Sequence, residues 1–231
     1  MRGFLNYMQQ NNVPLDFLSW HIYSNNPQDF ANAAIFYRAE LNARGYTATE
    51  SHITEWNTQF RDPTLDDVQL RTGAKASSLM TAAWINLQNQ NVAVSTFYRG
   101  TDPSMDATWF YGIFYANGTP KPVGLAFQLW KQMANHPKRS NVTLSGGNLS
   151  VLAGRNASGE FSFLISNPTA APTSWQLALP PNASATLVKM QEIRAPATAI
   201  SQTYLSGLSS TIDAYALQLV TVRLRKWQTS R

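Results

Sequence analysis

A change of pattern near residue 137 limits what this chain can fold into more than any other feature. Between residues 15 and 135, short strand-like runs alternate with longer segments whose apolar residues recur at helical spacing. After the break at 135–138, strand-like runs follow one another without helices. The first pattern is typical of β/α units around a parallel sheet, and the second of an antiparallel β-domain. We therefore predict an α/β fold with two domains, residues 1–137 and 138–231.

The first domain is predicted to contain three β/α units. Asn26 and Pro27 supply an N-cap and a first-position proline for the helix of the first unit. Thr64 and Asp67 have the spacing of a capping box and open the second helix, and the third helix begins at Pro122. The three strands are predicted at 15–23, 51–57 and 92–98.

Three β/α units cannot close a barrel, because the smallest barrel of this kind uses about eight strands and ~250 residues. Residues 3–10 have the pattern of the end of an earlier helix. A short parallel sheet leaves unpaired edges and one uncovered face. We therefore predict a partial (β/α) barrel of the TIM type, comprising about its last three units. Either the first half of the barrel is missing, or copies of the chain form a homo-oligomer that covers the open barrel edges, which is our expectation.

The second domain is predicted to be a small antiparallel β-sandwich. Turn residues, such as those at 156–159 and 180–182, separate its strand-like runs. The strands are predicted at 149–153, 161–166, 175–179, 186–193 and 215–224.

Composition excludes several classes of function. The net charge is +5, but the basic residues are scattered, with the tightest group at Arg223, Arg225 and Lys226, so no nucleic-acid partner is expected. No apolar run approaches the ~20 residues that cross a bilayer, so no membrane partner is expected. There is no cysteine, the histidines lack metal-ligand spacing, and no glycine-rich phosphate loop is present, so we expect neither a metal nor a cofactor. The compartment stays open, with a secreted or periplasmic location favoured.

Reactive side chains are expected at the carboxyl ends of the strands, which form the active face of a β/α barrel. Because side chains alternate along a strand, His21 and Tyr23 share one face of the first strand. By the same rule Ile53, Glu55 and Asn57 share one face of the second. A glutamate is disfavoured in a buried strand unless its charge is satisfied or used. Glu55 is therefore the leading catalytic candidate, with a salt-bridged structural glutamate as the alternative.

Two segments resemble glycoside hydrolase family 39, which includes β-xylosidases and α-L-iduronidases. The run DFLSWHIY at 16–23 is similar to the family's sixth barrel strand, and ITEWN at 53–57 is similar to the seventh, whose glutamate is the nucleophile. Only the Thr-Glu-Trp-Asn part is specific, and related barrel glycosidases also place a glutamate there. The start of the last barrel helix, at Lys121 and Pro122, and a terminal β-domain fit the family as well. The resemblance implies retaining hydrolysis of β-linked, xyloside- or glucoside-like substrates, with Glu55 as nucleophile.

A carbohydrate partner is expected to bind around Glu55. His21 and Tyr23 either orient Glu55 or contact a sugar hydroxyl, and the alternative for His21 is a satisfied core residue. Trp56 has the opposite parity to Glu55, so it packs in the core unless the strand end twists it into the cleft. Aromatic residues in and after the next loop form a platform for sugar rings, unless core packing or an oligomer contact explains them. The predicted substrate-binding residues are His21, Tyr23, Trp56, Asn57, Tyr98 and Trp109.

A second carboxyl group is the missing part of this site. Retaining hydrolysis needs it ~5–5.5 Å from the nucleophile, and the Asn-Glu pair that carries it in the family is absent. Glu50 is ~16 Å from Glu55 at ~3.3 Å per residue. Asp102 and Asp106 are the candidate acid/base residues, because their loop leaves the active end of the neighbouring strand. The alternative for both is that they are turn-forming loop residues. A neighbouring chain is another possible source of the carboxylate. The alternative function is a non-catalytic carbohydrate-binding or structural relic of a glycosidase barrel.

Overall fold

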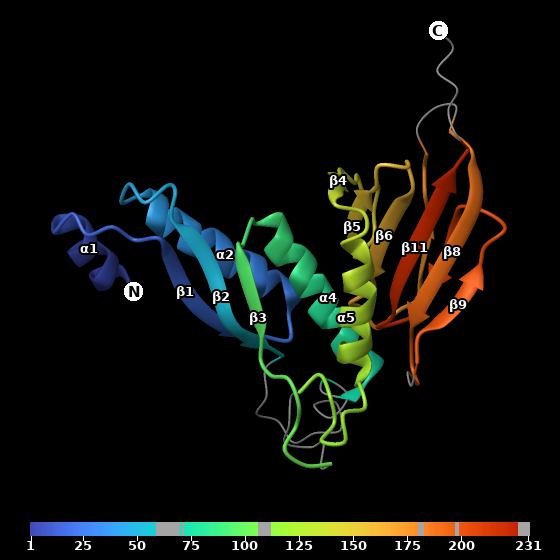
Figure 1. Ribbon diagram of the computed structural model, residues 1–231, viewed down its shortest axis with the longest axis horizontal. Coiled ribbons are helices and arrows are strands. Elements are labelled where there is room, and N and C mark those ends of the chain that lie inside the picture. Colours follow the sequence, from blue (N-terminus) through green and yellow to red (C-terminus); the bar gives the residue numbers. More distant parts are fainter. Residues whose placement is uncertain (59–69, 71, 106–111, 180–182, 197–198, 226–231) are drawn as a thin grey trace, which may run out of the picture.

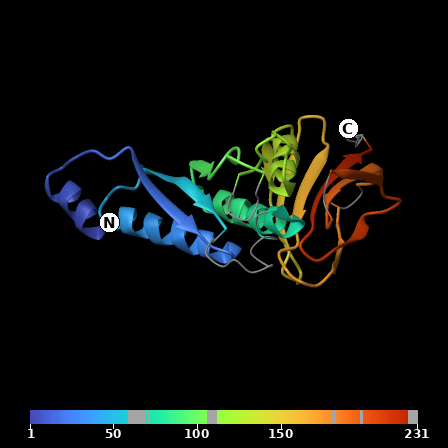
Figure 2. The same ribbon diagram turned by 90° about the horizontal axis from the view of Figure 1, so that it is seen from below.

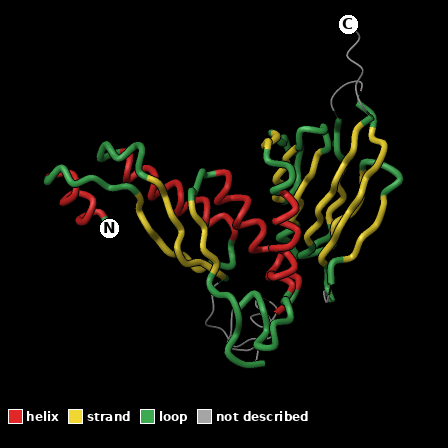
Figure 3. Tube along the Cα trace, viewed as in Figure 1, coloured by secondary structure: helices red, strands yellow, loops and turns green. Residues whose placement is uncertain are grey.

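The computed structural model describes residues 1–58, 70, 72–105, 112–179, 183–196 and 199–225. Figure 1 shows a parallel sheet towards one end of the molecule and an antiparallel β-domain at the other. Figure 3 shows helical segments standing between the two groups of strands. The predicted α/β fold is confirmed, whereas its description as part of a barrel stays a proposal.

The first part of the chain contains a three-stranded parallel sheet in the order β1-β2-β3. Its strands, which correspond to the three predicted runs, are β1 (Phe17–Tyr23), β2 (Glu50–Asn57) and β3 (Val94–Phe97). The helices around them are α1 (Arg2–Gln10), α2 (Pro27–Asn42), α4 (Ala74–Asn89) and α5 (Pro122–Met133). Thr64 and Asp67, the predicted capping box, lie outside the described residues.

The start and end of α2 follow from its local sequence. The Asn26 side chain accepts a hydrogen bond from the Gln28 backbone N–H at 3.1 Å, and Pro27 occupies the first turn, as predicted. Gly45 follows the helix with φ 84°, a left-handed conformation that costs glycine little. These two signals mark the start and the end of α2, after which the chain forms β2, parallel to β1.

Described residues cover only one face of the parallel sheet. Figure 2 shows α2 and α4 along that face, and Trp20 and Ile53 point into the helical core with 4% and 0% exposure. On the opposite face, Phe17 and Val94 are 50% and 41% exposed. In a closed barrel this opposite face lines the interior.

A bulge in β2 corrects the predicted alternation of its side chains. Ile53 and Glu55 pair with consecutive residues of β1, so Thr54 is an extra residue between them. Ile53 and Trp56 are therefore both buried on the helix side, with 0% exposure each. Glu55 instead lies beside His21, on the open side. The prediction that Ile53 and Glu55 share a face is wrong, because the inserted residue shifts the parity.

The second part of the chain consists of antiparallel strands. Its strands are β4 (Lys138–Ser140), β5 (Ser150–Arg155), β6 (Phe161–Ser166), β7 (Thr173–Gln176), β8 (Ala185–Ile193), β9 (Ser201–Tyr204), β10 (Ser209–Ile212) and β11 (Leu217–Leu224). Six of them form one sheet in the order β4-β5-β6-β11-β8-β9, and β7 pairs with β10 in a second sheet. The short strands β4, β9 and β10 are additional to the predicted set, and β7 begins two residues earlier than expected.

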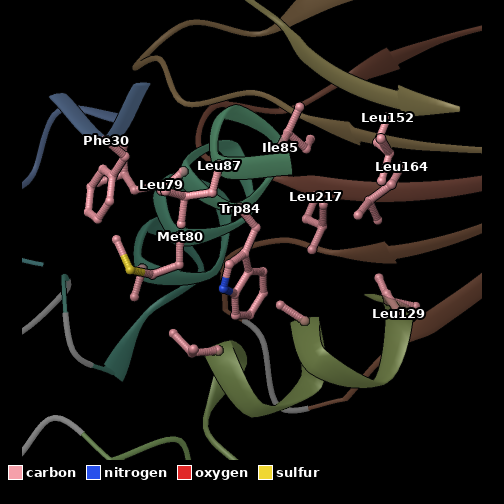
Figure 4. Close-up of a cluster of buried hydrophobic side chains, with 14 of the residues drawn as sticks. Phe30, Leu79, Met80, Trp84, Ile85, Leu87, Leu129, Leu152, Leu164 and Leu217 are labelled. Atoms are coloured by element: carbon pink, nitrogen blue, oxygen red, sulfur yellow. The ribbon is translucent and has the colours of Figure 1, made fainter. Parts of the chain in front are cut away.

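The six-stranded sheet is covered on both faces, as the alternation along β11 shows. Leu217 and Leu219 belong to the core cluster that includes α4 and α5. Val220 and Val222 belong to a second cluster with residues of β7 and β10. Figure 4 shows side chains of α4, α5 and the sheet meeting in the first cluster. One hydrophobic core therefore continues across residue 137, where the sequence pattern changes.

Candidate functional site

The carboxyl ends of the parallel strands meet at one edge of the sheet (Figure 1). Tyr23 pairs with Asn57 where β1 and β2 end. The Tyr98 backbone N–H donates to the Trp56 carbonyl at 3.0 Å, which ties the end of β3 to β2. This edge is where parallel β/α folds bind ligands, and it holds most of the side chains predicted from the sequence.

Glu55 is held in place on the open face and is still accessible. The Tyr23 hydroxyl donates a hydrogen bond to one carboxylate oxygen, and His21 Nδ1 lies 4.0 Å from the other. The Glu55 side chain is 36% exposed and that of His21 is 53% exposed. A hydrogen bond to an ionised carboxylate is stronger than one between neutral groups, so Tyr23 fixes the orientation of Glu55. The arrangement fixes the Glu55 carboxylate and leaves it accessible to solvent.

Thr54 joins this group because of the bulge, and sequence reasoning missed it. Its hydroxyl lies 3.0 Å from His21 Nε2 and 2.5 Å from the Ser19 hydroxyl. With strict alternation, Thr54 would face away from Glu55. No signal in the local sequence marks the bulge, because a threonine fits either face of a strand.

Asn57 and Tyr98 form the border of the site towards β3. The Asn57 side-chain amide donates to the Tyr98 carbonyl, and its Oδ1 accepts from the Thr58 backbone N–H at 2.7 Å. The Tyr98 ring meets Tyr23 edge-on, with 6.3 Å between centroids, and is 37% exposed. Asn57, which is 4% exposed, positions the loop after β3, whereas Tyr98 offers an aromatic surface beside the pair formed by Tyr23 and Glu55.

Trp56 does not reach the site, which corrects its assignment as a substrate-binding residue. It is fully buried and packs edge-on against Phe30, Trp84 and Phe97, with centroid distances of 5.3, 5.5 and 5.1 Å. The bulge at Thr54 turns Trp56 towards the helices. Its contribution is the packing that fixes the backbone next to Glu55.

Asp102 is equally inaccessible, which corrects its candidacy as acid/base. Its carboxylate binds the Lys121 ammonium group and accepts the Gly112 backbone N–H at 2.7 Å, and both charged side chains are 0% exposed. A Cβ on Gly112 would lie 2.6 Å from this carboxylate, so the contact requires glycine. Asp102 therefore anchors the loop between β3 and α5. Asp106 and Trp109 lie outside the described residues.

The buried partner of Asp102 is a second residue that sequence reasoning missed. Lys121 immediately precedes α5, where the positive end of the helix dipole disfavours a cation. That conflict is a signal that its charge is compensated by an anion. Lys121 also lies 5.2 Å from the centroid of the Tyr115 ring, a favourable position for a cation.

Metal binding and membrane insertion find no support in the described part of the chain. No group of three or more histidine and acidic side chains there could hold a metal ion. None of its helices combines the length and the hydrophobicity of a membrane-spanning segment.

Comparison with solved structures places this arrangement among known folds. A glucosidase from Croceicoccus marinus matches 95% of the chain with a TM-score of 0.69 at 24% identity. A monomeric β-xylosidase from Caulobacter crescentus matches 96% with a TM-score of 0.68 at 12% identity. A GH39 enzyme from Xanthomonas axonopodis pv. citri matches 96% with a TM-score of 0.65 at 15% identity.

The chain has a glycosidase-like fold. The resemblance to family 39 read from the strand segments agrees with this similarity, which includes enzymes of that family. No protein-family model and no curated protein sequence matches the chain. The glycosidase-like fold covers 56%, 58% and 57% of the three solved chains, so the sequence spans little more than half of their length.

Proposed function

We propose that this chain carries the nucleophile of a retaining glycoside hydrolase that acts on β-linked, xyloside- or glucoside-like substrates. Glu55 is the nucleophile. The observation that carries the proposal is the position of its carboxylate, which lies at the strand-end edge, is held by Tyr23 and is partly open to solvent. The printed names of similar structures, a glucosidase and a β-xylosidase, agree with this class of substrate.

The proposed reaction proceeds in two displacement steps. The Glu55 oxygen not bonded to Tyr23 attacks the anomeric carbon, and the bond to the leaving-group oxygen breaks as that oxygen receives a proton. Water then attacks the glycosyl ester and releases Glu55 and the sugar. The Tyr23 hydrogen bond keeps the attacking oxygen directed to the open face, where His21 and Tyr98 contact sugar hydroxyls and a sugar ring.

In this proposal Asp102 is not the acid/base residue, because its carboxylate is bound to Lys121. Its three candidate sources are Asp106, the first half of a barrel supplied by further polypeptide, and a second copy of the chain. A second copy that pairs with the open edges of β1 or β3 forms the homo-oligomer we expect. Asp106→Asn tests the first source, since loss of the acid slows substrates with poor leaving groups most.

A binding protein without turnover is the second candidate. It is favoured by the burial of Asp102, which removes one acid/base candidate from the described part of the chain. In that case Glu55, His21 and Tyr98 retain a sugar through hydrogen bonds and stacking. The two functions differ in whether the sugar is released as a product.

Hydrolysis of an aryl β-D-xyloside tests the proposal directly. Wild-type protein is expected to release the phenol, and Glu55→Gln is expected to lose at least ~100-fold in kcat, because the neutral amide cannot attack. Glu50→Gln is the matched control. Glu50 lies at the other end of β2, where it contacts His52 at 2.8 Å, and its substitution should leave the rate unchanged. Equal rates for wild type and Glu55→Gln remove Glu55 from the mechanism.

Azide rescue separates a nucleophile from a binding residue. In Glu55→Ala, azide can enter the vacated space, attack the anomeric carbon and yield a glycosyl azide. Detection of that product supports the nucleophile role. Sugar binding by calorimetry, with no turnover in wild type and no azide product, supports the second candidate instead.

A further inference from the structure

A solvent-accessible cleft lies at the junction of α5 and the β-domain, away from Glu55. Its volume is about 270 Å³, and it is lined by the last turn of α5, the link to β4, the end of α4 and part of β5. Helix α5 has twelve residues, about 18 Å of length. Figure 1 shows α5 leading from the loops at the strand-end edge towards β4. The cleft is therefore distinct from the candidate glycosidase site.

Two cations set the electrostatics of this cleft. Lys131, in the last turn of α5, and Arg139, in β4, line it together with His136, and none of the described residues that line it is acidic. His136 lies 3.1 Å from the Glu160 carboxylate, which offsets a positive charge on the imidazole ring. The carboxyl ends of α4 and α5 each contribute roughly half a negative charge, and the two full positive charges of Lys131 and Arg139 outweigh both together. The cleft therefore favours an anion.

Arg139 is held in a defined orientation. Its Nη1 donates to the Gln88 carbonyl at 3.3 Å, and its Nη2 donates to the Asn89 side chain. A guanidinium group carries five N–H donors, so these bonds fix the plane of the group without using all of them. A fixed guanidinium plane suits a carboxylate, which it can bind through two parallel hydrogen bonds.

Most of the remaining walls of the cleft are apolar. Trp130, Met133 and Leu152 contribute to them, and the Trp130 ring is fixed by packing against Trp84 with 5.5 Å between centroids. Gly154 lies so close to the linking segment that a Cβ on it would be 2.3 Å from the His136 carbonyl oxygen. The lining of the cleft therefore combines an aromatic and aliphatic surface with two cations.

We propose that this cleft binds a small carboxylate with an apolar face, with Arg139 and Lys131 holding the carboxylate and Trp130 contacting the apolar face. Two kinds of molecule share this chemistry. A hexuronic acid presents C–H bonds to the indole ring, and an aryl carboxylate presents a π surface. The volume is close to ~300 Å³, the lower end of the size range of small-molecule pockets, so the occupant is limited to about one ring.

Titration of the full chain with D-glucuronate and, separately, with benzoate tests this proposal by calorimetry and tryptophan fluorescence. At least one carboxylate is expected to bind saturably, more tightly than D-glucose or inorganic phosphate. Arg139→Gln and Lys131→Gln are each expected to weaken binding about tenfold, since each removes a charge-assisted contact. Both side chains are exposed, so Lys131→Gln is expected to keep the wild-type melting temperature, and Arg139→Gln, which also loses its bonds to the Gln88 carbonyl and the Asn89 side chain, is expected to stay folded.

Two matched variants show whether the effect belongs to this cleft. Lys138→Gln removes a neighbouring charge that does not line the cleft, and Glu55→Gln alters the other site; both are expected to bind the carboxylate as wild type does. The proposal is overturned if neither carboxylate binds saturably, if phosphate binds as tightly, or if Arg139→Gln leaves affinity unchanged. It is also overturned if Glu55→Gln abolishes binding. Which of the two carboxylates binds more tightly distinguishes the sugar acid from the aryl acid.

Discussion

The two main sheets of the molecule differ in how they are covered. The six-stranded sheet has helices α4 and α5 on one face and β7 with β10 on the other, so side chains of both parities along β11 are buried. Described residues cover the parallel sheet on one face only, and Phe17 stays 50% exposed on the other. Burying a side chain of this size stabilises by ~1.5–3 kcal/mol, so a partner that covers Phe17 would gain binding free energy. The candidate site lies at the parallel sheet, whose second face is not covered by described residues. The antiparallel sheet is packed on both faces.

The largest effect should come from breaking the buried ion pair that anchors the loop of the open sheet. Lys121→Met leaves the Asp102 carboxylate buried without its cation, and loss of one partner of such a pair costs about 3–5 kcal/mol. Unfolding in urea measures the loss. Lys131→Met, which changes an exposed lysine in α5, the helix that Lys121 precedes, is the control and should change the free energy of unfolding by less than about 0.5 kcal/mol. Equal small losses in both variants would contradict the anchoring role.

A slightly smaller loss is expected where the covered sheet meets the helices. Leu217 is fully buried between β11 and the helical layer, and Leu217→Ala should cost about 2–5 kcal/mol through lost contacts and a cavity. Phe17→Ala, on the open face, is the matched comparison and should cost less than half as much in the monomer. The contrast between covered and open sheets fails if the two variants lose the same stability.

The open edges of the parallel sheet should matter for association more than for folding. Val94→Lys places a charge on an exposed position of an edge strand and should leave the melting temperature of the monomer nearly unchanged. If copies of the chain cover the open edges, this variant shifts the sedimentation distribution towards monomer. Glu50→Lys, on the central strand and largely exposed, is a control for added charge. A wild-type chain that is monomeric at micromolar concentration contradicts the expected homo-oligomer.

Local sequence predicted the elements well, because their signals lie within a few residues. The cap at Asn26 and the strand β6 at Phe161–Ser166 are found where the pattern placed them. The convergence of His21, Tyr23 and Glu55 was also predictable, since parallel strand ends share one edge of a sheet. What could not be predicted depends on pairing between segments.

Two features of the site show this limit. The bulge at Thr54 is a property of the register between β1 and β2, and it places Ile53 and Glu55 on opposite faces, whereas strict alternation would put them on the same face. The burial of Asp102 depends on Lys121, nineteen positions away. A cation at the start of a helix indicates that a partner exists, but the spacing along the chain does not identify it.

The smallest predicted effect lies at the outer margin of the open sheet, where α1 contacts α2. The hydrogen bond from Arg2 is the largest cause that lowers the pKa of Glu40 below its ordinary value of 4.5; desolvation opposes it, and the hydrogen bond from Arg44 adds to it. A lowered carboxyl pKa means that the ionised form favours the folded state. This contribution is complete above pH 4.5 and disappears as the pH falls through the folded pKa. Carboxyl resonances followed by NMR should show Glu40 titrating below 4.5 in wild type and closer to 4.5 in Arg2→Gln. Because Arg2 is largely exposed, salt should reduce the shift, and identical titration of the two proteins would show that α1 is not held to α2 by this pair.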